Sequence, residues 1–165
     1  MRQSLERRGL HVRMVEDHAV LQDRTRAALG ADLFVSIHHD SVRPEFLPDA
    51  DLYSGFSLFV SRLNPQLEKS IACASAIGAQ MRSIGLAPSR YHADPVFGEN
   101  RPYADEANGV HFFDNLAVAR TAPMPAVLVE AGVIVNRHEE QRLREPQMRA
   151  RMAEAIAQGV RNCLP

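Results

Sequence analysis

The chain has 165 residues, of which 45% are hydrophobic and 24% are charged, and its formal net charge is −1. This length fits one domain with a single sizeable core, and the composition is ordinary for a globular protein. So small a net charge gives no global field that would favour nucleic acid or an anionic membrane. No apolar run approaches the roughly 20 residues that span a bilayer. Residues 1–8 also lack the apolar segment of a secretory signal.

In the first half of the chain, apolar periodicity and turn residues predict alternating helices and strands. The predicted helices cover residues 1–8, 20–29 and 65–83, and Asn64 is expected to cap the last of them. The predicted strands cover residues 10–15, 32–38 and 55–60, and the strand at 32–38 is expected to be buried. Residues 16–18 and 40–54 are expected to be loops, the second because of its prolines and aspartates.

The second half begins with residues 87–109, which are rich in Pro, Gly, Asn and charge and are expected to form a long irregular loop. Residues 112–119 are apolar and fit either a strand or a short helix. A second buried strand is predicted at 126–129, followed by helices at 137–143 and from 146 onward. Because strands alternate with helices, we predict one α/β domain over residues 1–165, with a mainly parallel sheet and helices on both faces.

The two cysteines, Cys73 and Cys163, lie in segments with helical periodicity and do not form a CxxC pair. Their spacing gives no support for zinc binding by thiolates. We interpret both as small buried apolar residues, and the sequence leaves open a disulfide between them as the less favoured alternative.

Two strand ends carry candidate catalytic groups. The strand at 32–38 ends in His38, and the strand at 126–129 is followed by Glu130. In α/β sheets, sites lie outside the carboxyl ends of strands, and neutral imidazole is a common zinc ligand. Strand alternation turns His39 away from His38 and returns Asp40 to the His38 side, where it could orient a ligand. Glu130 lies between apolar residues, where an unpaired carboxylate is costly to bury. One interpretation is a strand-end carboxylate that lies in solvent or in an ion pair, and the other is a general base.

Weaker candidates lie in the predicted loop and after the second strand. Polar groups are dense around His92, Glu99 and Arg101, and the simplest interpretation is a solvated loop. The alternative is substrate recognition, in which Arg101 would bind a carboxylate. Asn136 is expected to stabilise a turn, and a part in substrate binding is the weaker alternative. The other histidines, at 11, 18, 111 and 138, have no spacing partner and are interpreted as structural or exposed.

Four segments, in order, resemble the zinc-dependent N-acetylmuramoyl-L-alanine amidases of bacterial cell walls (the amidase-3 family). Residues 30–40 (GADLFVSIHHD) and 125–136 (PAVLVEAGVIVN) carry the two long motifs, and residues 55–60 and 114–120 resemble the segments between them. The resemblance implies a phosphorylase/hydrolase-like fold and hydrolysis of the amide between N-acetylmuramic acid and L-alanine in peptidoglycan. It also implies that His38 is a zinc ligand and that Glu130 is the catalytic glutamate.

Family members hold zinc with two histidines and one glutamate, and the other two ligands lie in a first strand and at the start of a first helix. Residues 1–9 resemble the end of that helix, so we expect that the family's first strand and two ligands are missing from this chain. A catalytic zinc needs about three protein ligands. We therefore expect that this polypeptide alone is inactive, or nearly so.

The sequence leaves two other functions open, a non-catalytic peptidoglycan-binding or regulatory module and another zinc peptidase or deacylase on a similar scaffold. Peptidoglycan is the expected partner, nucleic acid is not, and an activator protein is left open. The chain shows no export signal, which taken literally indicates the cytosol, whereas the family's substrate indicates the periplasm or the cell exterior.

Overall fold

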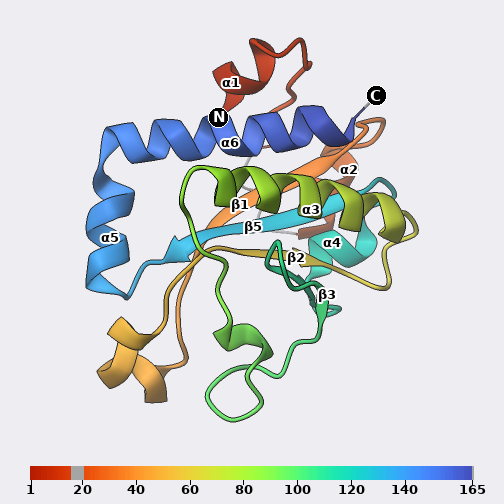
Figure 1. The fold of residues 1–165 in the computed structure, drawn as a ribbon. Helices are drawn as coiled ribbons and strands as arrows, with labels where there is room; N and C mark the ends of the chain where they lie inside the picture. The colour runs from red at the N-terminus through yellow and green to blue at the C-terminus, as the bar shows by residue number, and fades with distance from the viewer. Residues whose placement is uncertain (16–20, 165) are drawn as a thin grey trace.

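A computed structural model of the chain describes residues 1–15 and 21–164. Its centre is a five-stranded sheet with the strand order β1-β5-β2-β4-β3 (Figure 1). The strands are β1 (Phe34–Asp40), β2 (Ser57–Val60), β3 (Tyr103–Asp105), β4 (Val110–Phe112) and β5 (Ala126–Val133). The pairs β1–β5 and β2–β4 are parallel and contain most of the paired positions, whereas β2–β5 and β3–β4 are antiparallel. The predicted α/β class is therefore confirmed.

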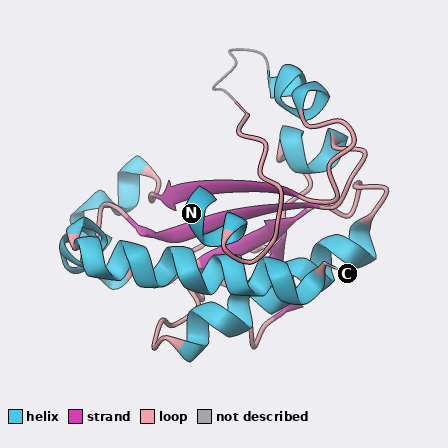
Figure 2. Cartoon of the chain, turned by 90° about the horizontal axis from the view of Figure 1, so that it is seen from above, coloured by secondary structure: helices cyan, strands magenta, loops and turns pink. Residues whose placement is uncertain are grey.

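Helices cover both faces of this sheet (Figure 2). The long helices α3 (Leu67–Ser83) and α6 (Pro146–Cys163) pack against one another and against one face, and α5 (Arg137–Arg144) leads into α6. The short helices α2 (Leu21–Ala27) and α4 (Ala117–Thr121) lie on the other face beside β5. The remaining helical segments are α1 (Arg2–Glu6), which packs on α6, and the 3₁₀ segments η1 (Pro44–Leu52) and η2 (Tyr91–Ala93).

The main core lies between the sheet and the pair α3–α6. Alternate residues of β5, Val127 and Val129, point into it and meet Leu58 of β2 and Ile77 of α3. The two helices approach very closely, because a Cβ atom at Gly159 would lie 2.4 Å from the Cα atom of Ile77. A glycine is therefore required at this crossing, and it lets the helix backbones pack without a gap.

Asn64 acts as a connector between two loops rather than as the predicted helix cap. Helix α3 begins at Leu67, with Gln66 in the cap position. The Asn64 side-chain oxygen accepts a hydrogen bond from the backbone N–H of Gln66 at 2.7 Å. Its amide nitrogen donates to three backbone carbonyls, that of residue 119 within α4 and those of residues 122 and 124 after it. The start of α3 is thus tied to the turn that precedes β5.

Three expectations about regular structure are wrong. Residues 10–15 form no strand; Leu10 packs on the main core and Val15 on a separate small cluster. Strand β1 is half-exposed rather than buried, because it is the edge strand of the sheet. The segments expected to be irregular loops are partly regular, because 40–54 contains η1 and 87–109 contains η2 and β3. The apolar stretch at 112–119 divides between the end of β4 and the start of α4. The loop predicted at 16–18 lies outside the described residues.

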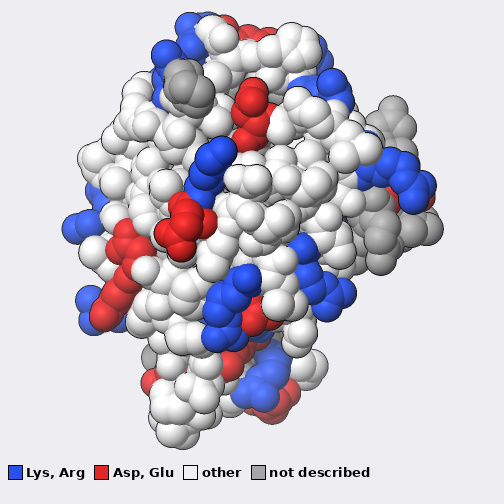
Figure 3. Space-filling model, turned by 90° about the vertical axis from the view of Figure 1, so that its right-hand side faces the viewer, with Lys and Arg blue, Asp and Glu red and all other residues white. Residues whose placement is uncertain are grey.

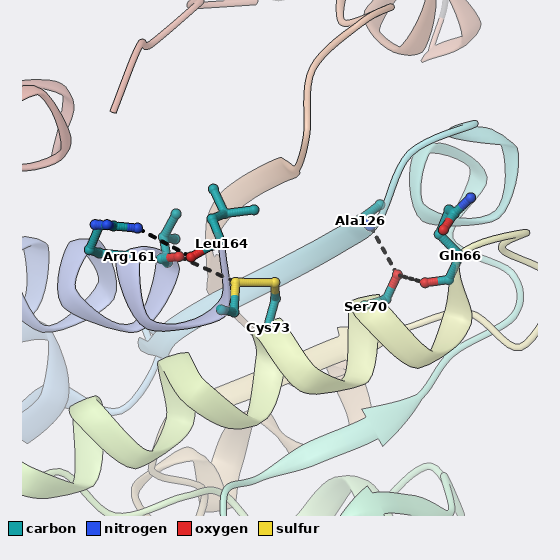
Figure 4. The surroundings of a disulfide bond; sticks show 8 residues. Gln66, Ser70, Cys73, Ala126, Arg161 and Leu164 are labelled. Carbon is teal, nitrogen blue, oxygen red and sulfur yellow. Dashed lines mark hydrogen bonds between the residues drawn. A yellow bond between two sulfur atoms is a disulfide. The ribbon is translucent and has the colours of Figure 1, made fainter. Parts of the chain in front are cut away.

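A disulfide joins Cys73 of α3 to Cys163 of α6, across a sequence separation of 90 residues (Figure 4). The favoured interpretation, two separate buried thiols, is therefore wrong, because the close packing of α3 and α6 brings the two cysteines together. One turn earlier on α3, the hydroxyl of Ser70 donates to the carbonyl of Gln66 and accepts from the backbone N–H of Ala126 at the start of β5. The cross-link and Ser70 together fix α3 to the sheet and to α6.

The surface carries charges of both signs. On the face shown in Figure 3, basic and acidic side chains alternate and leave wide uncharged areas between them. Among the described residues, no helix is both long enough and apolar enough to span a bilayer.

Candidate functional site

Polar side chains gather on the sheet face opposite α3. His38 of β1 and Ser57 of β2 are both register partners of Glu130, which lies on β5 between them. Side chains at paired positions of neighbouring strands project from the same face of a sheet. The structure therefore brings together His38 and Glu130, the two residues that the sequence predicted to share a site.

Glu130 is held in a partly apolar setting. Its Oε2 atom is buried and has no hydrogen-bond partner among the residues that the structure describes. Burial, reinforced by the negative charges of Asp40 and Glu99, raises the pKa of Glu130 to about 7, against a counteracting effect of His92. A carboxyl group that titrates near neutrality suits a general base, which must gain and lose a proton during turnover.

His38 lies at the open edge of the sheet. Its Nε2 atom is 2.8 Å from the hydroxyl oxygen of Ser36, two residues earlier on the same face. Both residues line a hollow of about 170 Å³, whose walls are otherwise mainly apolar. Phe34 of β1, Leu128 of β5 and Leu116 before α4 supply much of that lining, and Glu130 is not part of it. The hollow gives His38 access from outside, as a ligand or substrate contact requires.

Asp40 faces the loop that was expected to be irregular. A bulge in the β1–β5 ladder follows His38, and the Asp40 carboxylate accepts hydrogen bonds from the hydroxyl of Tyr91 and from Nε2 of His92, the latter at 2.8 Å. Burial and the negative charge of Asp40 raise the pKa of Tyr91, which therefore stays a neutral donor. The expectation of a solvated loop is wrong for His92, which is only 2% exposed.

Glu99 and Arg101 continue this group of charges. Glu99 accepts from Nδ1 of His92 at 2.8 Å and from Nε of Arg101 at 2.5 Å, and the bond to His92 is the main reason that the pKa of Glu99 falls to about 2. The guanidinium carbon of Arg101 lies 3.2 Å from the ring centre of Phe113. The sequence suggested that Arg101 binds a substrate carboxylate; in the structure its carboxylate partner is Glu99.

Asn136 caps α5. Its side-chain oxygen accepts from the backbone N–H groups of His138 and Glu139, and its amide nitrogen donates to the carbonyls of Asp51 and Tyr53. The predicted turn-stabilising role is confirmed by these bonds. Because its polar atoms are engaged with backbone, a part in substrate binding stays a prediction, as it does for Glu99 and Arg101.

Three residues of this face were missed or undervalued at the level of sequence, namely Ser57, Tyr91 and His92. Ser57 gave a faint signal, because it is the one polar position of a short apolar strand. Tyr91 gave none and His92 only a weak one, because their partner Asp40 lies more than fifty residues away in the chain. Density of polar residues in a long loop was the nearest available indication.

The chain resembles proteins of one family in both sequence and fold. The family model described as N-acetylmuramoyl-L-alanine amidase matches residues 1–162. Among solved structures, Ami1 from Mycobacterium abscessus shares 24% identity with a TM-score of 0.76, covering 99% of this chain and 73% of that protein. The catalytic domain of CwlV from Bacillus (Paenibacillus) polymyxa var. colistinus shares 25% identity with a TM-score of 0.69, covering 96% of this chain and 75% of that one.

A third solved structure, AmiC2 of Nostoc punctiforme, shares 25% identity with a TM-score of 0.67, and the match covers 94% of this chain and 73% of that protein. All three are named as N-acetylmuramyl- or N-acetylmuramoyl-L-alanine amidases. A comparison with curated protein sequences found no significant match.

Proposed function

Since this chain belongs to the N-acetylmuramoyl-L-alanine amidase family, which cleaves the amide bond between N-acetylmuramic acid and L-alanine in peptidoglycan, we propose that Glu130 is its general base and His38 a metal ligand. The observation that carries this proposal is the buried Oε2 atom of Glu130, which has no hydrogen-bond partner among the described residues. Glu130 lies at the same register position as His38. A buried carboxylate oxygen is costly to leave without a hydrogen bond, and a water held for reaction would satisfy it.

The proposed chemistry is hydrolysis of a linear amide. Glu130 in its ionised form accepts a proton from the attacking water, whose oxygen adds to the lactyl carbonyl carbon. Glu130 then returns the proton to the departing nitrogen as the C–N bond breaks. The products are a lactyl carboxylate on the glycan strand and a stem peptide with a free L-alanine amino group. A pKa of about 7 lets Glu130 perform both transfers near neutral pH.

Zinc is the cofactor that we propose, with His38 as one ligand. When bound, zinc would polarise the carbonyl and lower the pKa of its water. Catalytic zinc has about three protein ligands and one open position. No group of three or more His, Cys, Asp or Glu side chains placed to hold a metal occurs within residues 1–15 and 21–164. The described residues thus fit one ligand position and the base, and we assign no other ligand.

We also propose that the protein acts outside the cytoplasmic membrane, as one catalytic domain over residues 1–165 in cell-wall turnover. Peptidoglycan lies in the periplasm or at the cell exterior. The Cys73–Cys163 disulfide supports the same location, because structural disulfides persist in oxidising compartments and are rare in the cytosol.

Product analysis tests the proposed activity. Because residues 1–165 alone are expected to be inactive or nearly so, the test uses the protein with a complete set of zinc ligands. This protein is incubated with zinc and purified peptidoglycan sacculi, and the soluble products are identified by mass spectrometry. Intact stem peptides that begin with a free L-alanine amine are expected, together with glycan strands whose lactyl groups end in free carboxylates. Binding to sacculi without peptide release would instead indicate a non-catalytic module. Cleavage within the stem peptide would indicate a peptidase.

A further inference from the structure

The buried side-chain polar atoms that lack a hydrogen-bond partner in the described part of the chain all belong to four residues. They are the hydroxyls of Ser57 and Ser89, both ring nitrogens of His111 and the Oε2 atom of Glu130. Buried polar groups nearly always have a partner, because an unmet hydrogen bond inside a protein is costly. The hydrolysis proposed for Glu130 accounts for that residue alone and does not explain the other three.

The sheet register places Ser57 between two of the other residues. Ser57 of β2 is the register partner of Glu130 on the antiparallel strand β5. On the other side of β2, an isolated parallel bridge joins Phe56 to Pro88, and the backbone N–H of Ser89 donates to the carbonyl of Phe56 at 2.7 Å. Ser57 and Ser89 directly follow this bridge and are therefore the next positions in register. Paired side chains project from the same face, with Cβ atoms roughly 4.5–5.5 Å apart, so Glu130, Ser57 and Ser89 form one row.

His111 lies one step further along the same face, which is the face opposite α3. It is the register partner of Phe59, the next residue of β2 whose side chain points the same way as that of Ser57. The ring is fully buried, and backbone groups of Ser89 and Arg101 approach it without a well-formed hydrogen bond from any described residue. Burial is the main reason that the pKa of His111 falls to about 4, so the ring is neutral near pH 7.

The unmet groups of Ser57, Ser89 and His111 suit a water molecule rather than an ion. Each hydroxyl donates one hydrogen bond and accepts others, and a neutral imidazole has one donor and one acceptor nitrogen. No group of His, Cys, Asp or Glu side chains placed to hold a metal occurs among the described residues. Ser57 is fully buried and Ser89 is 1% exposed, so bulk solvent does not reach them. An internal water, with two donors and two acceptors, matches this set of groups.

We propose that Ser57, Ser89 and His111 hold an internal water beside Glu130, and that Ser57 is a positioning residue of the amidase site. The water joins the hydroxyl of Ser57 to the carboxylate of Glu130 and fixes the direction in which that carboxylate points. A carboxylate oxygen accepts more than one hydrogen bond, so Glu130 contacts the internal water and the attacking water together. The positioning role rests on the function proposed for Glu130, whereas the water site does not.

The first test locates the water without an assay of activity. A high-resolution crystal structure of the metal-free protein is expected to show one ordered water within hydrogen-bonding distance of the Ser57 hydroxyl and the Glu130 carboxylate. The same water should contact Ser89 or a ring nitrogen of His111. In Ser57→Ala the water is expected to be lost or displaced, with the backbone unchanged. Hydroxyls that bond directly to protein groups, with no water between them, would overturn the water site.

The second test measures whether the two serines share one partner. Unfolding in urea gives equilibrium constants for Ser57→Ala, Ser89→Ala and the double variant. Because groups that bind the same water depend on one another, the combined effect is expected to depart from additivity by about fivefold in the unfolding constant. The exposed Ser83→Ala on α3, combined with Ser57→Ala, is the matched control and should show no coupling. Additive effects of Ser57→Ala and Ser89→Ala would overturn the shared water.

The third test concerns the positioning role and uses the protein with a complete set of zinc ligands. Ser57→Ala is expected to lower kcat for the release of stem peptides about tenfold while KM stays the same, because the hydroxyl directs the base and does not bind substrate. Ser61→Ala is the matched control. Ser61 directly follows β2 and is also fully buried, but its hydroxyl contacts Asp114 and the backbone N–H of Leu63. A kcat of Ser57→Ala equal to that of the parent, or an equal loss in Ser61→Ala, would overturn the positioning role.

The outcomes separate the two proposals. If the parent protein released no stem peptides, the proposed function would fail, and the crystal structure and the unfolding experiment would still decide whether the water site exists. Should Ser57→Ala not fold, as judged by circular dichroism, Ser89→Ala takes its place in the kinetic test with the same expected loss of kcat. The crystal structure of the parent protein then decides the water site.

Discussion

His38 and Glu130 occupy the same register position on the parallel strands β1 and β5. Their spacing is therefore fixed by the backbone ladder rather than by flexible loops. The base and the metal ligand proposed at these two positions would keep their geometry as substrate enters and leaves, because they sit on adjacent strands. Ser57, the partner of Glu130 on its other side, extends the same row onto β2. This relationship is the basis of the first predictions.

Glu130→Gln is expected to lower the rate of amide hydrolysis by about 10²–10⁴-fold, because the amide cannot accept the proton of water. The fold should be retained, since Gln has nearly the same shape. Release of stem peptides from sacculi measures the effect, and the exposed Glu68→Gln on α3 is the control. Near-normal turnover in Glu130→Gln would remove Glu130 from the mechanism.

Glu130→Gln should also stabilise the metal-free protein at alkaline pH. The pKa of Glu130 rises from 4.5 to about 7 on folding, so between these values the unfolded chain releases its proton first and becomes relatively favoured. The destabilisation of the folded state by Glu130 is absent below pH 4.5 and complete above about pH 7. Since the side chain is partly exposed, we expect a gain in Tm of roughly 2–4 °C at pH 8 and little at pH 5. Differential scanning calorimetry at the two pH values checks this, and an equal gain at both would contradict it.

His38→Ala is expected to reduce the zinc content of the full-length protein, whereas His39→Ala should leave it unchanged. The two histidines are adjacent, but strand alternation directs their side chains to opposite faces. Zinc is measured by atomic emission after dialysis at a fixed free-metal concentration. Equal loss in both variants would indicate a general effect on the strand rather than a ligand at His38.

Reduction of the Cys73–Cys163 disulfide should destabilise the fold by about 2–5 kcal/mol, because the bond closes a long loop between α3 and α6. Urea unfolding with and without dithiothreitol measures the difference. The double variant Cys73→Ala, Cys163→Ala is expected to match the reduced protein and to show no response to the reductant. A reduced protein as stable as the oxidised one would mean that helix packing alone holds α6.

Asn64→Ala is expected to lower the free energy of unfolding by about 1–3 kcal/mol, since three carbonyls and one N–H lose their partner. Asn64→Asp is the informative control. It keeps the oxygen that accepts from Gln66 but turns a carboxylate toward the three carbonyls. We expect Asn64→Asp to be no more stable than Asn64→Ala, and full stability in it would show that the bond to Gln66 dominates.

Much of the fold follows from local sequence. The strands β2 and β5 and the helices α3, α5 and α6 could be predicted from local sequence. In these segments the apolar periodicity and the Pro, Gly and Asn residues that mark the segment ends indicate the same element. Residues 10–15 have the same alternation and form no strand, because pairing depends on which backbone lies alongside, and no local pattern encodes that. The edge position of β1 was hidden for the same reason.

The site divides in the same way. His38 and Glu130 were found because each interrupts or ends an apolar run, which is a local signal. His92 was named only as a weak candidate in a polar loop, because its burial and its contacts with Asp40 and Glu99 come from the fold. The disulfide also needed the crossing of α3 and α6 before two isolated cysteines became a pair.

The alternation along β5 makes this strand intolerant of insertions and deletions. Val127 and Val129 face the core, and Glu130 faces the site. Adding or removing a single residue before Glu130 would exchange the two faces, sending the carboxylate among the side chains of α3 and a valine to the place of the base. Natural variation in this segment should therefore consist of substitutions, and a change of length would cost the protein its fold and its chemistry together.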